Sequence, residues 1–166
     1  MGRIVATLEQ AIELAVKYHK GQVDKAGNPY ILHPLRLMQK MEYESDQIVA
    51  VLHDIIEDTP VTLEMLKEMG FKSYVIEAID CLTKQKDEEY DRYIDRICKE
   101  YTACKVKLAD LEDNMDLSRL PEIKEEDKSR LQKYQKAHDK ITKTMNRTCS
   151  GCGNPPMYCD CHEGLL

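Results

Sequence analysis

Four titratable side chains stand close together in the segment VAVLHDIIED of residues 49–58, which is otherwise apolar enough to be buried. If the segment is helical, His53 and Glu57 are four residues apart, as are Asp54 and Asp58, so the four side chains share roughly one face. Adjacent carboxylates repel one another unless a cation neutralises them. The segment therefore predicts either a cation site or a satisfied core histidine followed by a solvated acidic helix end.

Two more polar residues stand in apolar runs, where packing gives no reason for them. His33 lies within ILHPL, and Asp110 lies within VKLADLEDN. Together with His53 and Asp54 they make a set of two imidazoles and two carboxylates. Nitrogen and oxygen ligands of this kind suit Mn²⁺, Fe²⁺ or Zn²⁺ with positions open for water and substrate. The set predicts a divalent metal site built from three separate helices.

The elements that must position these residues are predicted to be helices almost throughout. Apolar residues recur at helical spacing, and strand alternation extends over no more than a few residues. The predicted helices cover about residues 8–19, 35–41, 48–56, 62–70, 72–82, 88–100, 102–119 and 124–146. The fold class is therefore all-α.

Local signals mark several helix starts. Thr7 followed by Gln10 has the spacing of a capping box. Ser45 or Asp46 is expected to cap the helix that runs without interruption through residues 48–56. Thr62 is expected to cap the next helix.

Composition excludes several classes of protein. The chain has 166 residues and a formal charge of −6, with 24 basic and 30 acidic residues, which argues against a protein that coats nucleic acid. No apolar run approaches the roughly 18 residues of a membrane span, and polar residues follow the N-terminus too early for a signal peptide. We expect a cytoplasmic protein. We expect a main domain over 1–120, a polar helix over 121–147 packed on it, and a Cys-rich tail over 148–166.

The tail contains four cysteines within a short stretch, Cys149, Cys152, Cys159 and Cys161. Four thiolates at this spacing, with glycines and prolines for tight turns, favour a closed tetrahedral Zn²⁺ site in a reducing compartment. A tail disulfide or simple reactive thiols are the alternatives. A zinc knuckle here would hold the tail together or contact a protein partner. The sequence does not define the oligomeric state.

The order His…His-Asp…Asp resembles that of the HD-domain metal-dependent phosphohydrolases, an all-α helical bundle. More narrowly, the chain is similar to the hydrolase domain of the RelA/SpoT family and to small alarmone hydrolases. The matching segments occur in family order over about residues 5–120. They are AVKYHKGQ (15–22), GNPYILHPL (27–35), VAVLHDIIEDT (49–59), AIDCLTK (78–84) and VKLADLEDNM (106–115).

The resemblance assigns roles to individual residues. It places His33, His53, Asp54 and Asp110 at a metal ion, favouring Mn²⁺. It makes Glu57 and Asp58 the pair that orients and deprotonates the attacking water. In the family, the reaction removes pyrophosphate from the 3′ position of guanosine tetra- or pentaphosphate. The substrate-binding positions that match are Lys25, Thr83, Lys84 and Asn114.

Four positions depart from the family pattern. Asp24, Leu111, Asp113 and Asp116 stand where the family usually has basic residues or histidine. A substrate with four or five phosphates depends on such cations, and acids would repel it. Two alternatives therefore stay open beside the alarmone. One is a nucleotidase or phosphatase acting on a less phosphorylated nucleotide or an NADP-type substrate, and the other is a non-catalytic nucleotide-binding module.

Overall fold

The computed structural model describes residues 5–119 and 122–147. The four tail cysteines of the predicted zinc knuckle lie outside these residues. Within them, the only extended pairing is an isolated bridge between Val23 and Pro29, so the predicted all-α class is confirmed. The elements in order are α1 (Leu8–Tyr18), α2 (Leu32–Gln39), α3 (Glu44–Leu52), α4 (Ile55–Asp58), α5 (Leu63–Glu68), α6 (Ser73–Leu82), α7 (Tyr90–Ile97), α8 (Tyr101–Met115), the 3₁₀ helix η1 (Leu117–Arg119) and α9 (Glu125–Met145).

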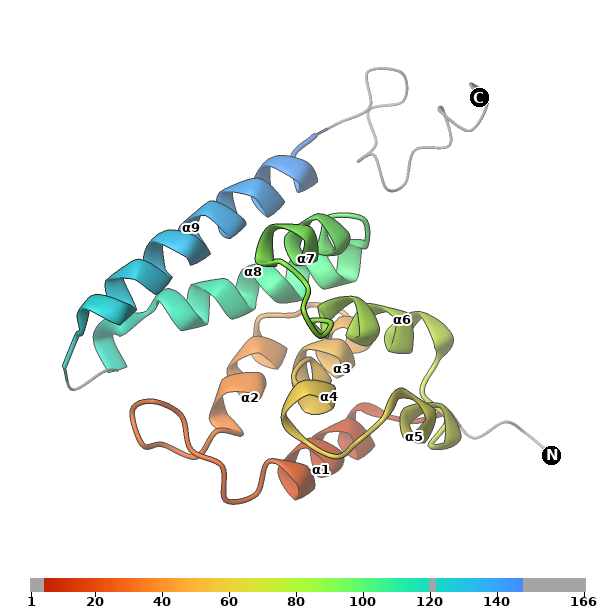
Figure 1. Ribbon diagram of the computed structural model, residues 1–166. Helices are drawn as coiled ribbons and strands as arrows, with labels where there is room; N and C mark the ends of the chain where they lie inside the picture. Colours follow the sequence, from red (N-terminus) through yellow and green to blue (C-terminus); the bar gives the residue numbers. More distant parts are fainter. Residues whose placement is uncertain (1–4, 120–121, 148–166) are drawn as a thin grey trace, which may run out of the picture.

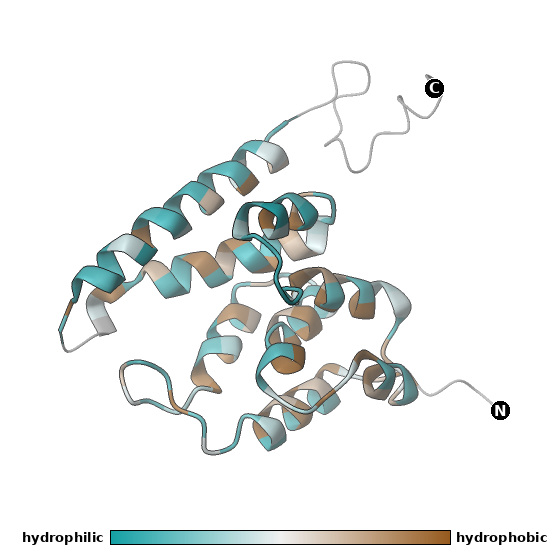
Figure 2. Cartoon of the chain, viewed as in Figure 1, coloured by the Kyte–Doolittle hydropathy of each residue, from teal (hydrophilic) through white to brown (hydrophobic). Residues whose placement is uncertain are grey.

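Helix α3 lies at the centre of the bundle. It packs against α1, α2, α6 and α8, and Figure 1 shows these helices around it. Its residues Ile48 to Leu52 are all buried, which is why this stretch is apolar on every side. Figure 2 shows the same contrast, with brown apolar residues on α3 and α6 and mostly teal polar residues on α9. The central helix therefore fixes the place of whatever follows its C-terminal end.

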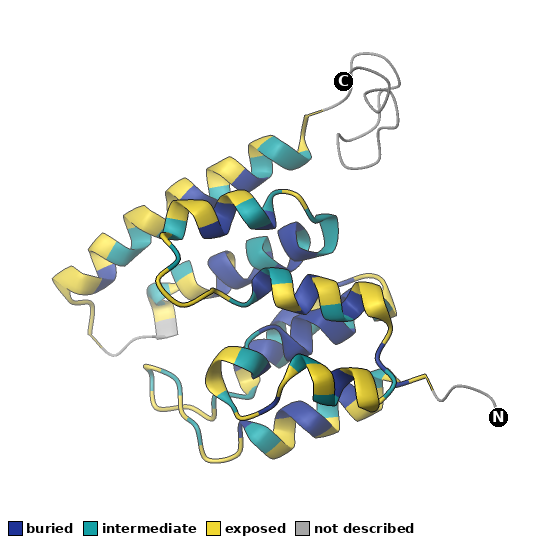
Figure 3. Ribbon diagram, turned by 45° about the vertical axis from the view of Figure 1, so that its right-hand side comes forward, coloured by how far each residue is buried: buried dark blue, intermediate teal, exposed yellow. Residues whose placement is uncertain are grey.

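Helix α9 runs antiparallel to α8 along one side of the bundle (Figure 1). It buries Ala137 and Ile141, while most of its remaining surface is exposed in Figure 3. This one-sided burial explains its alternating charges, because only a narrow stripe faces α8 and α7. The predicted division of the chain at residue 120 stays a prediction.

Two local predictions of caps are confirmed. Thr7 accepts the amide of Gln10, and the Gln10 side chain accepts the amide of Thr7, which completes the capping box of α1. Thr62 caps α5 by accepting the amide of Met65. Such caps depend on residues three apart in the sequence, so they can be predicted locally.

The predicted start of the central helix is wrong. Its N-cap is Tyr43, which makes no side-chain capping bond. Asp46 is instead buried, where it pairs with Lys105 and accepts a hydrogen bond from Thr102 at 3.3 Å. The acid therefore joins α3 to α8 rather than capping its own helix.

The predicted uninterrupted helix over residues 48–56 is also wrong. Helix α3 ends at Leu52, and Asp54 has φ −101° and ψ 0° before α4 begins at Ile55. The His53 ring explains part of this break, because its Nδ1 lies 2.8 Å from the carbonyl oxygen of Ala50. The His53 ring thus takes the place of the Asp54 backbone amide, which would bond to the Ala50 carbonyl in an unbroken helix. Likewise α8 ends at Met115, earlier than expected, and η1 follows it.

In the part of the chain that the structure describes, none of the helices has the length and apolar character that crossing a membrane requires.

Candidate active site

The corner between α3 and α4 carries two of the predicted metal ligands, and α2 carries a third beside them. His33, His53 and Asp54 offer ligand atoms that all lie within 4.8 Å of one another. Both histidines are buried, and their ring centroids are 5.2 Å apart. The helix break at His53 directs its ring and the Asp54 carboxylate toward α2.

Asp110 joins this cluster from α8. Its Oδ1 lies 3.2 Å from Nε2 of His33 and 3.9 Å from Nε2 of His53. The structure thus brings all four predicted ligands together from three parts of the chain. We call His33, His53, Asp54 and Asp110 the HD cluster.

The two imidazoles are oriented so that Nε2 of each points toward the carboxylates of the HD cluster. Nδ1 of His33 lies 2.7 Å from Oδ2 of Asp113, and Nδ1 of His53 lies against the Ala50 carbonyl. Nε2 of His53 is buried, and although Oδ2 of Asp54 is 2.9 Å away, it makes no well-aligned hydrogen bond. Metal-binding histidines are held in this way, with the outer nitrogen bonded and the inner one available. The donor set therefore fits a divalent cation.

The ionisation of the HD cluster follows from its burial and its charges. Burial raises the pKa of Asp54, but the neighbouring His53 outweighs it and lowers the pKa to about 2. Burial lowers the pKa of His33, but its hydrogen bonds to Asp110 and Asp113 raise the pKa to about 9. The carboxylates of Asp54 and Asp110 therefore stay ionised, which a carboxylate ligand of a divalent ion requires.

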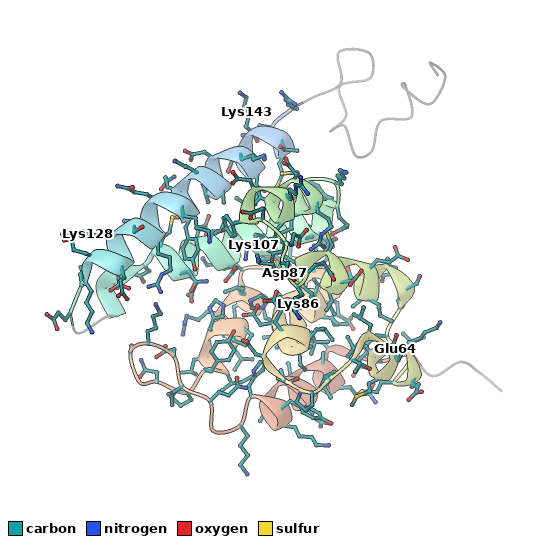
Figure 4. All side chains as sticks on the ribbon, in the orientation of Figure 1. Glu64, Lys86, Asp87, Lys107, Lys128 and Lys143 are labelled. Carbon is teal, nitrogen blue, oxygen red and sulfur yellow. The ribbon has the colours of Figure 1, made fainter. Side chains whose placement is uncertain are left out.

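Lys107 contributes to this balance and was not singled out from the sequence. Its Nζ lies 2.8 Å from Oδ2 of Asp110, on the same helix three residues away. Burial opposes its charge, but Asp110 outweighs this and raises its pKa. Figure 4 shows Lys107 inside the molecule, whereas Lys128 and Lys143 extend outward from α9. Its signal in the sequence is a lysine within the apolar run VKLADL, one helical turn before an acid.

Asp113 does not act as the repulsive acid that the sequence suggested. Arg36 of α2 binds both of its oxygens, at 2.7 and 2.8 Å. Burial raises the pKa of Asp113, but the hydrogen bonds and charges of Arg36 and His33 together outweigh this and lower the pKa. The carboxylate is therefore neutralised while it also orients His33. Arg36 and Asp113 are 77 residues apart, so no local pattern could have paired them.

Glu57 and Asp58 follow the HD cluster on the short helix α4, and both are exposed. Oε1 of Glu57 accepts the backbone amide of Lys84 at 2.6 Å. Although both are exposed, the protein atoms around each carboxyl group displace part of its water and raise its pKa, and the charge of Asp54 adds to the rise. The hydroxyl of Tyr30 donates a hydrogen bond to Oδ2 of Asp54. The two acids thus stand beside the HD cluster with pKa values above their ordinary range.

A cavity of about 300 Å³ opens beside the HD cluster. Two of the four predicted substrate residues, Lys25 and Asn114, line it, and Nδ2 of Asn114 also donates to Oδ1 of Asp110 at 2.5 Å. Thr83 and Lys84 are not among its lining residues. Thr83 donates its hydroxyl to the Ile79 carbonyl at the end of its own helix.

Helix α9 supplies a wall of this cavity that sequence reasoning missed. Arg130 and Tyr134 line it, and Oδ1 of the buried Asp127 lies 2.5 Å from Arg130 and 3.9 Å from Lys25. Asp127 thus connects α9 to the loop that carries Lys25. Nothing in the sequence distinguishes Arg130 or Tyr134 from the other residues of a charged helix.

Asp24 also lines the cavity and has a clear local role. Its Oδ1 accepts the amides of Ala26 and Asn28, each at 2.9 Å. These bonds close the turn in which Gly27 adopts a φ of 81°, a conformation that glycine reaches without strain. The acid at this position therefore shapes the loop between α1 and α2.

The helical fold together with this His, His-Asp and Asp cluster defines an HD-type domain. The chain is 32% identical over 126 residues to "Bifunctional (p)ppGpp synthase/hydrolase SpoT" of Escherichia coli, a match that covers 67% of this chain and 18% of that protein. It is 34% identical over 119 residues to the guanosine-3′,5′-bis(diphosphate) 3′-pyrophosphohydrolase of Aquifex aeolicus, covering 66% and 17%. We therefore place the domain in the RelA/SpoT family, as the HD-type hydrolase domain, and the predicted resemblance is confirmed.

A solved structure supports the fold. It is described as a metazoan ortholog of SpoT that hydrolyzes ppGpp, and it matches with a TM-score of 0.68 at 22% identity, covering 85% of this chain and 88% of that one. No family model matches the chain. The chain spans less than a fifth of the length of the curated relatives named above.

The contact between Asp113 and His33 generates a testable prediction. Replacing Asp113 with Asn removes the charge that orients the imidazole, so we expect affinity for Mn²⁺ to fall about 10- to 100-fold. Isothermal titration with Mn²⁺ measures this. The control is Glu112→Gln, because Glu112 is exposed and pairs with Lys40 away from the HD cluster. Equal affinities for the two variants would show that Asp113 has no such role.

Proposed function

We propose that this chain is a metal-dependent phosphohydrolase that removes pyrophosphate from the 3′ position of guanosine tetra- or pentaphosphate. The observation that carries the proposal is the convergence of two imidazole nitrogens and two carboxylates beside a cavity that Lys25 and Arg130 help to line. The names of the relatives in Escherichia coli and Aquifex aeolicus support the same reaction.

In this proposal His33, His53, Asp54 and Asp110 hold a divalent ion. The ion, when bound, lowers the pKa of a water molecule and polarises the phosphoryl group. Asp113 and the Ala50 carbonyl keep the two imidazoles in the required orientation. The choice of Mn²⁺ rests on the resemblance to the family, since the donor set also suits Fe²⁺ and Zn²⁺.

Glu57 and Asp58 are proposed to orient the attacking water and accept its proton. Their raised pKa values bring them closer to neutral pH, where a general base works best. The Lys84 amide fixes the Glu57 carboxylate on one side. Neither residue belongs to the four ligands, so both remain available for proton transfer.

The cavity is proposed to bind the nucleotide. Lys25 and Arg130 carry positive charge toward bound phosphates, and Asn114 offers its amide beside Asp110. Tyr134 offers an aromatic ring on the same wall. Thr83 and Lys84 remain predicted substrate contacts outside this lining.

A second candidate is a nucleotidase or phosphatase for a less phosphorylated nucleotide or an NADP-type substrate. The observation that favours it is that Asp24 and Asp116 also line the cavity, beside the Asp113 carboxylate that Arg36 neutralises. Leu111, which stands where the resemblance leads us to expect a basic residue, is fully buried and is not among the residues that line the cavity. A non-catalytic nucleotide-binding module is the third alternative.

A panel of nucleotides tests the reaction. The protein is incubated with Mn²⁺ and, separately, with guanosine tetraphosphate, nucleoside monophosphates and NADP, and pyrophosphate and phosphate are measured independently. We expect pyrophosphate from the tetraphosphate. Phosphate from the monoesters or NADP instead would favour the second candidate, and survival of every substrate would favour the binding module.

Two substitutions separate metal binding from proton transfer. Asp110→Ala should lose both bound metal and activity, because the carboxylate is a proposed ligand. Glu57→Gln should keep the metal but lose about 100-fold or more in kcat, the scale of a lost general base. Metal content and steady-state rates check both. Full metal occupancy in the Asp110 variant would refute the proposed ligand set.

The tail is proposed to bind Zn²⁺ through Cys149, Cys152, Cys159 and Cys161 and to offer a surface to a protein partner. Ending the chain after Arg147 should remove one equivalent of Zn²⁺ while the metal of the HD cluster stays. Elemental analysis of both forms checks this, and identical zinc contents would refute it. The cytoplasmic location remains a prediction.

A further inference from the structure

The C-terminal end of α6 is held by an arginine from a different helix. Nη1 of Arg96, on α7, donates to the carbonyl oxygens of Cys81 at 2.8 Å and Asp80 at 3.2 Å. Nη2 donates to the carbonyl of Thr83 at 2.9 Å. The last carbonyls of a helix lack their usual amide partners, so Arg96 supplies donors from outside, in addition to the Thr83 amide that also reaches the Asp80 carbonyl. One guanidinium thus fixes the point where α6 passes into the loop that follows.

The same guanidinium holds the far end of that loop. Nε and Nη2 of Arg96 bind the two carboxylate oxygens of Glu88 at 3.0 and 2.9 Å. Oε2 of Glu88 in turn accepts the amide of Gln85 at 3.0 Å. Between them Asp87 adopts a φ of 61°, unusual for a residue other than glycine. Figure 4 labels Lys86 and Asp87 in this loop between α6 and α7.

Lys84 lies between these two anchors. Its backbone amide donates to Oε1 of Glu57 at 2.6 Å, across to helix α4. The position of this amide depends on Thr83 before it and Gln85 after it, and Arg96 holds both, directly or through Glu88. Two hydrogen bonds, joined by the peptide group between Thr83 and Lys84, therefore connect Arg96 to Glu57.

We propose that Arg96 is a positioning residue that sets the orientation of the Glu57 carboxylate through the loop of residues 83–88. The role rests on the proposed function, in which Glu57 accepts the proton of the attacking water. Arg96 is not among the residues that line the cavity and acts only through the Lys84 amide.

Arginine suits this position because its contacts need several donors in one plane. Its guanidinium has five N–H donors in a rigid fork and serves three carbonyls and both oxygens of Glu88. A lysine ammonium has three donors on one atom and cannot span these groups. Arg96→Lys therefore keeps the charge but loses the geometry.

The experiment compares Arg96→Lys with the wild-type full-length chain. We expect kcat for guanosine tetraphosphate to fall about 10-fold or more while bound Mn²⁺ stays unchanged, because the HD cluster is not touched. KM should change less than kcat, although the same loop carries the predicted substrate contacts Thr83 and Lys84. The matched control is Arg92→Lys, an exposed arginine one turn earlier on α7, with unchanged kinetics expected. Unchanged kcat in Arg96→Lys, or a loss that falls mainly on KM or on metal content, would overturn the proposal.

A double-mutant cycle separates positioning from a general loss of stability. In the Glu57→Gln background, Arg96→Lys should cause little further loss, because both changes remove the same function. Additive losses would mean that Arg96 acts elsewhere. If Arg96→Lys does not fold, Glu88→Gln takes its place, with a smaller fall in kcat expected; an unchanged kcat would then overturn the proposal.

A measurement without substrate distinguishes this inference from the proposed function. In Arg96→Lys the amide proton of Lys84 should shift upfield and exchange faster with solvent, since its hydrogen bond to Glu57 loosens. In Arg92→Lys it should not change. If the wild-type chain hydrolyses no nucleotide but the Lys84 amide responds in this way, the proposed function fails and the positioning holds. An unchanged Lys84 amide in Arg96→Lys would overturn the positioning itself.

Discussion

The buried carboxylate of Asp110 is the group on which the rest of the site depends. An ionised carboxylate removed from water costs several kcal/mol unless charges and hydrogen bonds surround it. Here His33, Lys107 and Asn114 all contact it, and His53 lies nearby. Because these partners come from α2, from the residue that follows α3 and from α8, the three helices must be packed correctly before the acid can be buried. The chemistry of the site and the stability of the bundle thus share one constraint.

The break between α3 and α4 is the second determinant of the geometry. An unbroken helix would carry the Asp54 carboxylate around the axis, away from the direction in which His53 points. The break lets both side chains face α2 at once, and it starts a new helix that carries Glu57 and Asp58 just beyond them. The apolar core around α3 keeps this corner in place.

The sequence predicted what depends on short-range patterns. Helical periodicity, the capping box at Thr7 and polar residues isolated in apolar runs, such as His33 and Asp110, are all local features. The sequence did not predict the helix break, because the carbonyl contact of His53 depends on the ring's orientation. It also missed the wall formed by Arg130 and Tyr134, since only the packing of α9 on α8 brings them to the cavity.

The pairing of Asp113 with Arg36 has a consequence for how such domains diverge. The acid on α8 is tolerated at the edge of the HD cluster because α2 supplies its counter-charge. A change at either position alone would leave a charge without its partner beside His33. The two positions should therefore covary among related chains, with arginine at position 36 accompanying an acid at position 113. Relatives that carry a neutral side chain at position 113 need no arginine at position 36.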